Sequence, residues 1–252
     1  NFTLDAANGT PTSTASAITF AATSGTKTIT TAGKTVDRPF TFDGVGGTWQ
    51  LVDALNIAAT ALTLTNGTFD ANGQNVTAGS LSSSNSNTRA LSLGTGTWTL
   101  SAIGTAWNCG TATNLTVTRA ASGSIKLTHA TSTFAGGGKT YRDLWFSGDA
   151  GTRTVTGSNT FGDFKVTTTS AAALKFTAGT TTTVDTFTVS GAAGAAITVS
   201  SVTAATHALV SAGTAITCQY LTVSYSLASG TGTWTAEHST DTLDIAAYIG
   251  PT

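Results

Sequence analysis

The chain has 252 residues, of which only 9% are charged, and its formal net charge is −1 at pH 7. The few Lys and Arg residues are scattered, which excludes the clustered positive surface that nucleic acids require. No apolar run approaches the roughly 18 residues of a membrane-spanning helix. We therefore expect neither a nucleic-acid partner nor membrane insertion. The chain begins at Asn1 and contains no Met, so we expect a processed or partial product.

A three-residue pattern, in which two apolar residues flank a mostly small or polar one, recurs along the chain. The steps between the first residues of successive copies are 22, 22, 29, 24, 29, 20, 23 and 34 residues, and one turn of a β-solenoid takes about 20–30 residues. Because side chains alternate along a strand, both apolar residues of a copy face the same side. The copies are Ile18–Phe20, Phe40–Phe42, Leu62–Leu64, Leu91–Leu93, Leu115–Val117, Leu144–Phe146, Phe164–Val166, Phe187–Val189 and Leu221–Val223.

This repeat predicts an all-β fold, a right-handed parallel β-helix (β-solenoid) of about nine rungs. Residues 1–252 are expected to form a single elongated domain, with segments 1–17 and 235–252 interpreted as terminal caps. The leading apolar residues of successive copies should then stack about 4.8 Å apart as one inward column. A tandem β-sandwich is the alternative, because it also uses short alternating strands and Gly-rich corners.

Strands and loops are also expected between these copies. The polar run at 80–88 is typical of a loop, and the step of 34 residues around His207 has room for one more rung. Further strands, on a second side of the coil, are predicted at Trp98–Leu100, Ile125–Leu127, Leu174–Phe176 and Ile197–Val199.

Two aspartates occupy equivalent places in neighbouring copies, in "YRDLWF" and "FGDFKV". Stacking brings Asp143 and Asp163 within about 5 Å of each other, which is the carboxyl separation that retaining glycosidases use. They are the candidate catalytic residues. Arg142 and Lys165 are placed to neutralise them, so we prefer the interpretation of a charge-paired strand edge, and a calcium-binding pair is a further alternative.

Trp145 is the tryptophan that strand alternation places outward, whereas Trp49 and Trp98 should lie in the core or at corners. An exposed aromatic ring beside polar groups can bind a sugar or a partner subunit. We therefore predict a ligand-binding cluster of Trp145, Lys165, Asp143 and Asp163.

Other sites are weakly indicated. Cys109 and Cys218 are expected to be two buried small apolar residues, with a single long-range disulfide as the alternative, and no histidine lies at zinc-ligand spacing from them, so no metal and no cofactor are predicted. The outward residues include a rank of threonines, which is a feature of ice-binding β-solenoids; the rank is interrupted at Asp43, Gly94, Trp145 and Lys165. Thr also suits exposed strand positions in general.

The second half of the chain carries the motifs "GGKTYRDLWFSG", "TVTGSNTFGDFKV", "LKFTAGTTTTVDTFTVSG" and "CQYLTVSYSLASGTGTW". These segments resemble the β-helical repeat region of phage tail, fibre and bacterial surface (adhesin-like) proteins. The ending "LDIAAYIGPT" departs from the Gly-Trp-apolar ending of that group.

The resemblance implies an extracellular, virion or cell-surface protein without catalytic activity, which forms a homo-oligomer or joins a larger assembly. We expect it to bind a glycan receptor or partner subunits, as a tail fibre, spike or decoration protein does. A polysaccharide depolymerase and an ice-binding protein are the alternative functions.

Overall fold

The computed structural model describes residues 1–4, 16–213 and 215–243, which form strands and turns without any helix. The chain divides into two compact units. The N-terminal unit comprises residues 1–102 and 106–126, and the C-terminal unit comprises residues 103–105 and 127–252. The expected single domain over 1–252 stays a prediction.

The strands up to residue 127 are β1 (Phe2–Thr3), β2 (Ile18–Phe20), β3 (Thr26–Thr30), β4 (Phe40–Leu51), β5 (Leu55–Asn56), β6 (Ala61–Asp70), β7 (Val76–Ala78), β8 (Ser80–Ser82), β9 (Arg89–Ser92), β10 (Thr97–Leu100), β11 (Gly104–Asn108), β12 (Leu115–Thr118) and β13 (Ser124–Leu127). Those that follow are β14 (Ser132–Ala135), β15 (Asp143–Phe146), β16 (Thr152–Thr156), β17 (Thr160–Val166), β18 (Ala172–Phe176), β19 (Thr181–Val189), β20 (Ile197–Ser201), β21 (His207–Ser211), β22 (Ile216–Gln219), β23 (Leu221–Ser224), β24 (Ser226–Gly230), β25 (Trp234–Glu237) and β26 (Thr240–Leu243).

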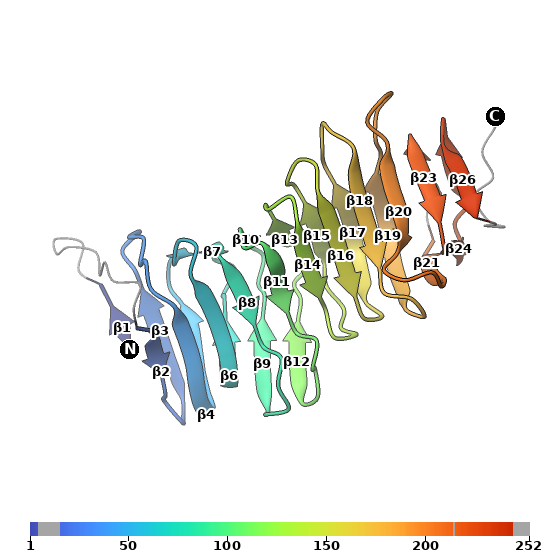
Figure 1. Cartoon of the computed structure of the whole chain (residues 1–252). Coiled ribbons are helices and arrows are strands. Elements are labelled where there is room, and N and C mark those ends of the chain that lie inside the picture. The colour runs from blue at the N-terminus through green and yellow to red at the C-terminus, as the bar shows by residue number, and fades with distance from the viewer. Residues whose placement is uncertain (5–15, 214, 244–252) are drawn as a thin grey trace. The chain divides into compact units, whose positions relative to one another are not determined.

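Within each unit, every named strand pair of the described chain runs parallel and joins successive turns, as Figure 1 shows. The strands build a parallel β-solenoid of about ten turns in all. This confirms the predicted fold class and excludes the β-sandwich, whose sheets are antiparallel. The right hand of the coil stays a prediction.

In the N-terminal unit the expected ladder holds for its first three copies. Ile18 pairs with Phe40, and Phe40 pairs with Leu62. The next step is different, because Leu62 pairs with Leu81 and not with Leu91. The expectation that Leu115 would stack on Leu91 is also wrong, by two residues, since Val117 takes that place.

The long strand β6 explains the first of these differences. Its first residues pair with β8, and its last residues, Gly67–Asp70, pair with β9. The strand turns a corner at Gly67, which has a φ of +75° and whose added Cβ would collide with the carbonyl oxygen of Gly44. One continuous strand thus lies on two sides of the coil. A pattern with one apolar triplet per turn therefore does not describe this part of the chain.

In the C-terminal unit Leu144 pairs with Phe164, and Phe164 pairs with Phe187. All three side chains are buried, and the rings of Phe164 and Phe187 stack at 5.2 Å. Each such burial contributes about 1.5–3 kcal/mol. The predicted column is therefore correct over these three turns.

The next expected step, from Phe187 to Leu221, is wrong. Leu221 pairs with Ile197, one residue of the predicted second-side strands, in the sheet formed by β14, β16, β18, β20, β23 and β26. The 34-residue interval instead contains the strands β21 and β22. Of these two, β21 continues the sheet of β15, β17 and β19. The extra rung expected near His207 is thus present.

A buried arginine holds the polar loop of the N-terminal unit. The sequence predicted a loop over 80–88, but residues Ser80–Ser82 form β8 and the loop begins after them. Arg89 is only 2% exposed. Its guanidinium donates five hydrogen bonds of 2.7–2.9 Å, to Ser83 Oγ and to the carbonyl oxygens of Ser83, Asn87, Thr111 and Thr113.

The expected terminal caps fall partly outside the described residues. Within segment 1–17, β1 pairs in parallel with β3, and residues 5–15 are not described. Within segment 235–252, β25 and β26 pair in parallel with β22 and β23, and residues 244–252 are not described.

Candidate functional site

The four predicted site residues lie together on the outer face of the C-terminal unit. Asp143 pairs with Asp163, and Trp145 pairs with Lys165, on the neighbouring strands β15 and β17. The next strand, β19, places threonines beside Asp163 and Lys165. We call this surface the outer strip, and it consists of Asp143, Trp145, Asp163, Lys165, Thr186 and Thr188.

Arg142, one of the two cations that the sequence indicated, forms ion pairs with both aspartates. Arg142 Nη1 lies 3.0 Å from Asp143 Oδ1 and 4.0 Å from Asp163 Oδ1. The backbone N–H of Asp163 donates to Asp143 Oδ1 at 3.1 Å, and the Thr186 hydroxyl donates to Asp163 Oδ1 at 2.6 Å. The carboxylates are therefore held by fixed partners along the strand edge.

The backbone of β17 makes room for this arginine at Gly162. A Cβ at this position would collide with Arg142 Nη1. The absence of a side chain therefore leaves room for the guanidinium next to the strand, within ion-pair distance of both carboxylates. A glycine directly before an outward Asp was the sequence signal for this arrangement.

Trp145 is the one tryptophan of the five that is not buried. Its indole Nε1–H donates to Thr167 Oγ1 at 2.8 Å, which fixes the ring across β17. Lys165 Nζ lies 4.9 Å from the ring centroid. An exposed cation–π contact of this kind is worth only about 0.5–1 kcal/mol, so a ligand can displace the lysine at small cost. Trp49 and Trp98 are buried, as predicted.

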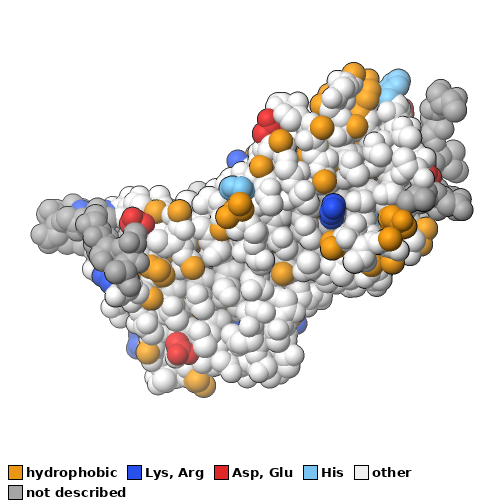
Figure 2. All heavy atoms as spheres, in the orientation of Figure 1, with side chains coloured by type: hydrophobic (Ala, Val, Ile, Leu, Met, Phe, Trp, Pro, Cys, Tyr) orange, Lys and Arg blue, Asp and Glu red, His pale blue; other side chains and the backbone are white. Residues whose placement is uncertain are grey.

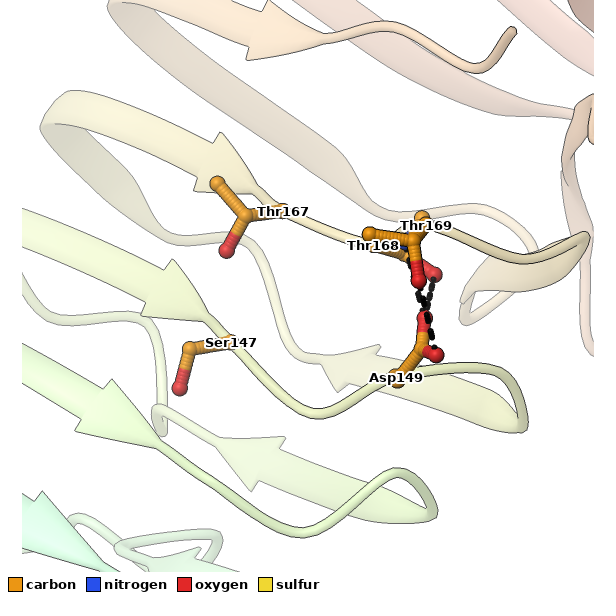
Figure 3. Close-up of a pocket in the computed structure, with 5 residues that line it drawn as sticks. All are labelled: Ser147, Asp149, Thr167, Thr168 and Thr169. Carbon is orange, nitrogen blue, oxygen red and sulfur yellow. Dashed lines mark hydrogen bonds between the residues drawn. The ribbon is translucent and has the colours of Figure 1, made fainter.

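A pocket of about 300 Å³ adjoins the strip at Thr167, and its lining also includes Ser147, Asp149, Thr168 and Thr169 (Figure 3). Asp149 reaches across to the next turn, as the dashed lines in Figure 3 show. Its carboxylate accepts five hydrogen bonds of 2.7–3.1 Å, from Thr168 Oγ1, the N–H and Oγ1 of Thr169, and the N–H and Oγ of Ser170.

These bonds hold the pKa of Asp149 well below its usual value, with the Thr168 hydroxyl as the largest cause. The fully buried Arg153 holds the same corner from inside, through the carbonyl oxygens of Gly148 and Gly151. Sequence reasoning identified "SGDAG" as a corner but missed this clamp. The hydroxyl-rich run "TTTS" one turn later was the signal for it.

A second pocket, of about 240 Å³, opens at the other end of the strip. Thr186 and Thr188 line it together with Ala215, Ile216 and Thr217. The strip is thus flanked by hydroxyl groups at both ends. The Trp145 ring and the charged residues of the strip lie between them. Its formal charges cancel when Arg142 is included, which favours a neutral ligand rich in hydroxyl groups.

The arrangement gives little support to acid–base catalysis. A retaining glycosidase needs one protonated carboxyl group and one free nucleophilic carboxylate. Here a single guanidinium forms ion pairs with both Asp143 and Asp163, and Asp163 is also bonded by Thr186. The preferred interpretation of a charge-paired strand edge agrees with these contacts.

Two stacked aromatic side chains form a separate surface near the C-terminal end of the described chain. Tyr220 and His238 hold equivalent corners of successive turns, with ring centroids 5.2 Å apart and ring planes 19° apart. We call them the aromatic ledge. Gln219 and Glu237 precede the two ring residues in the chain, and Gln219 Nε2 donates to Glu237 Oε2 at 2.9 Å. The sequence signal was an aromatic residue at the corner between two strands in "QYLTV" and "EHSTD", which sequence reasoning missed.

Both ledge residues have left-handed backbone, with φ of +52° for Tyr220 and +51° for His238. This conformation costs a residue with a Cβ roughly 1–2 kcal/mol, and a bulky side chain makes it a rarer outlier than Asn or Gly. One aromatic stack returns only about 0.5–1.5 kcal/mol. The cost of the left-handed backbone and the gain from the stack are thus of similar size, so the stack alone does not explain why two bulky rings occupy corners that suit Asn or Gly.

The described residues contain no group of three or more His, Cys, Asp or Glu that could hold a metal ion. Cys109 and Cys218 are buried and form no disulfide. No described helix is long and apolar enough to cross a membrane, and Figure 2 shows few charged side chains on the face drawn.

The fold and the strip define a parallel β-solenoid that carries a neutral, hydroxyl-rich surface around one partly exposed tryptophan. No protein-family model, no curated protein and no solved structure matches the chain. The resemblance to phage tail and bacterial surface proteins therefore stays an expectation drawn from the sequence.

Proposed function

We propose that the protein is a non-catalytic attachment module of a virion or bacterial surface, and that its outer strip binds surface glycans. The observation that carries this proposal is the set Trp145, Lys165 and Thr167, in which an outward ring is fixed by a hydrogen bond and flanked by a pocket of hydroxyl groups. Sugars combine an apolar ring face with many hydroxyls, so an aromatic plane beside hydroxyl and carboxylate groups complements them.

The solenoid supports this role mechanically. Each turn pairs with its neighbours along several strands, and the buried ladder from Leu144 to Phe187 keeps the strip residues in fixed register. A site on strands is held more rigidly than a site on loops, so little conformational entropy is lost when a glycan binds. An attachment protein presented outside the cell benefits from such a preformed surface.

Assembly is part of the proposal. A parallel solenoid ends in strands whose outer edges can pair with another chain, so its ends need a cap or a partner. A homo-oligomer, or docking onto a larger virion or surface assembly, satisfies this need. Sedimentation of the purified chain tests the first possibility, because a homo-oligomer sediments as a multiple of 25.2 kDa.

The test of glycan binding uses a printed array of capsular and O-antigen polysaccharides from bacteria. The purified protein is compared with Trp145→Ala, which removes the ring, and with Lys165→Ala, which removes the cation above it. Lys175→Ala is the matched control, because Lys175 is also an outward lysine in the middle of a strand, on β18 in a different sheet.

We expect the protein and the Lys175→Ala variant to bind the same polysaccharides, and Trp145→Ala to lose that binding. Lys165→Ala should change affinity by less than about fivefold, in line with the small worth of an exposed cation–π contact. Binding that survives Trp145→Ala, or no binding to any printed polysaccharide, would contradict the proposal. Release of free oligosaccharides from a bound polysaccharide would contradict its non-catalytic part.

A further inference from the structure

Left-handed corners are common in this solenoid, and most hold small residues. Among non-glycine residues they are Ala32, Ala58, Asn72, Asn114 and Ala150. The last described turns differ, because Tyr220, Tyr225 and His238 take the same backbone conformation. The backbone requirement at such a corner is met by Asn or Ala, so it does not explain the choice of an aromatic side chain there.

Two of these three aromatic residues lie face to face on the surface. The Tyr220 and His238 rings stack, Tyr220 is half-buried and His238 is exposed. Their corners are tied together, since the Tyr220 N–H donates to the Glu237 carbonyl oxygen at 3.0 Å and the Leu221 N–H donates to Ser239 Oγ at 2.9 Å. The rings are thus a preformed flat surface held by the backbone of two turns.

The residues directly before the two ring residues carry polar groups that suit hydroxyls. Gln219 and Glu237 are joined by a side-chain hydrogen bond, and each precedes one of the two ring residues in the chain. A carboxylate and an amide next to an aromatic face are the groups that hold a sugar ring by its hydroxyls while its C–H face lies on the aromatic plane.

We infer that the aromatic ledge, Tyr220 and His238 with Gln219 and Glu237, is a second glycan-binding site that accepts a neutral hexopyranose. The inference rests on the proposed function for the class of ligand, but the ledge shares no residue with the outer strip. A surface with two sites binds a long polysaccharide more tightly than either site alone, provided that one chain reaches both.

The first experiment is an NMR titration of the whole protein with maltoheptaose, cellohexaose and mannohexaose at millimolar concentration. We expect at least one of these neutral probes to shift the ring resonances of Tyr220 and His238 in a saturable way. The Trp145 indole N–H reports on the outer strip in the same titration. Shifts at Trp145 alone would overturn the ledge and keep the strip, and shifts at the ledge rings alone would do the reverse.

The second experiment separates binding from folding. The double variant Tyr220→Asn with His238→Asn places residues that tolerate left-handed backbone at both corners. We expect its Tm to be equal to or higher than that of the parent protein, and its affinity for the probe that binds to be about tenfold weaker. Tyr225→Asn is the matched control, since it relieves the same strain at a corner outside the ledge and should keep the affinity.

Unchanged affinity in the double variant, or an equal loss in Tyr225→Asn, would overturn the inference. If the double variant does not fold, the variant Tyr220→Phe with His238→Phe decides, because it keeps two ring faces at the ledge. Retained binding then supports the ledge, and lost binding overturns it.

Discussion

The two units of the molecule share one backbone architecture, each buries an arginine, and they differ in the residues on the outer face. In the N-terminal unit Arg89 binds the unit's own loops through five hydrogen bonds, and in the C-terminal unit Arg153 binds a corner of that unit. The C-terminal unit also carries the charged and aromatic residues of the outer strip around Trp145. The comparison teaches that a solenoid's ladder fixes only the inward residues, and that the outward ones are free to serve structure or binding.

Removing the arginine of the N-terminal unit should give the largest effect. Arg89→Met removes the donor of five hydrogen bonds, of which the two to Ser83 are buried, and the loss of hydrogen bonds from a charged group costs about 1.5–3 kcal/mol. We expect the free energy of unfolding of the N-terminal unit to fall by this amount in urea titrations, while the C-terminal unit keeps its stability. Arg119→Met is the matched control, because Arg119 is exposed. Equal stability of the two variants would contradict the role given to Arg89.

Acid should distinguish the units, because all three histidines, His129, His207 and His238, belong to the C-terminal unit. Burial lowers the pKa of His207 from 6.5 to about 4. The ring stacks on Phe176 at 4.6 Å, and Nε2 lies 3.0 Å from the Ser226 hydroxyl. The folded unit therefore keeps this histidine neutral, whereas the unfolded chain takes up a proton below about pH 6.5.

It follows that the stability due to neutral His207 is fully present above about pH 6.5 and is lost as the pH falls toward 4. At 1.36 kcal/mol per pH unit, the whole interval is worth about 3 kcal/mol. Urea titrations between pH 7 and pH 4 should show this loss in the C-terminal unit. The double variant His207→Phe with Ser226→Ala should remove it, and His129→Gln should not. An equal pH dependence in all three proteins would show that His207 is not its source.

A smaller effect is expected on the outer strip. Arg142→Gln leaves two carboxylates side by side on neighbouring strands, but the groups are partly exposed and screened by water. The loss of stability should be below about 1 kcal/mol, and it should shrink further in high salt. Arg142→Lys should recover part of the loss. A loss of stability that does not change with salt would indicate that Arg142 contributes through the packing of its guanidinium on Gly162 and not through its charge.

The smallest expected effect concerns Asp149, which is exposed at its corner. Its pKa is lowered by the hydroxyl and N–H donors of the next turn. It therefore contributes stability above its usual pKa of 3.8, and this contribution is lost only as the pH falls through the lower, folded value. An NMR titration of the side-chain carboxyl should place its midpoint below 3.8. A midpoint at the usual value would mean that the clamp to Thr168 and Ser170 is absent in solution.

The sequence predicted the fold class because inward residues recur once per turn, and Leu144, Phe164 and Phe187 do pair in the expected order. It could not predict which side of the coil each copy occupies, because all sides show the same apolar alternation. Leu91 and Leu221 were misplaced for this reason. The bend of β6 at Gly67 also hides a change of side within one strand.

The candidate site was predictable to the extent that it follows from the ladder. Once Leu144 lies next to Phe164, strand alternation places Asp143 beside Asp163 and Trp145 beside Lys165. The clamp at Asp149 depends on corner geometry, and the ledge at Tyr220 depends on two left-handed corners coming into contact. Neither follows from the period of the sequence, since corners vary in length from turn to turn.

The spacing of 20 residues from Leu144 to Phe164 and of 23 residues from Phe164 to Phe187 shows that one turn of the coil is a segment that could be duplicated as a whole. Because a turn touches only the turns above and below it, duplicating such a segment would lengthen the coil by about 4.8 Å and add one more row to its exterior. Evolution or protein design can therefore extend the recognition surface one turn at a time, without changing the packing of the interior.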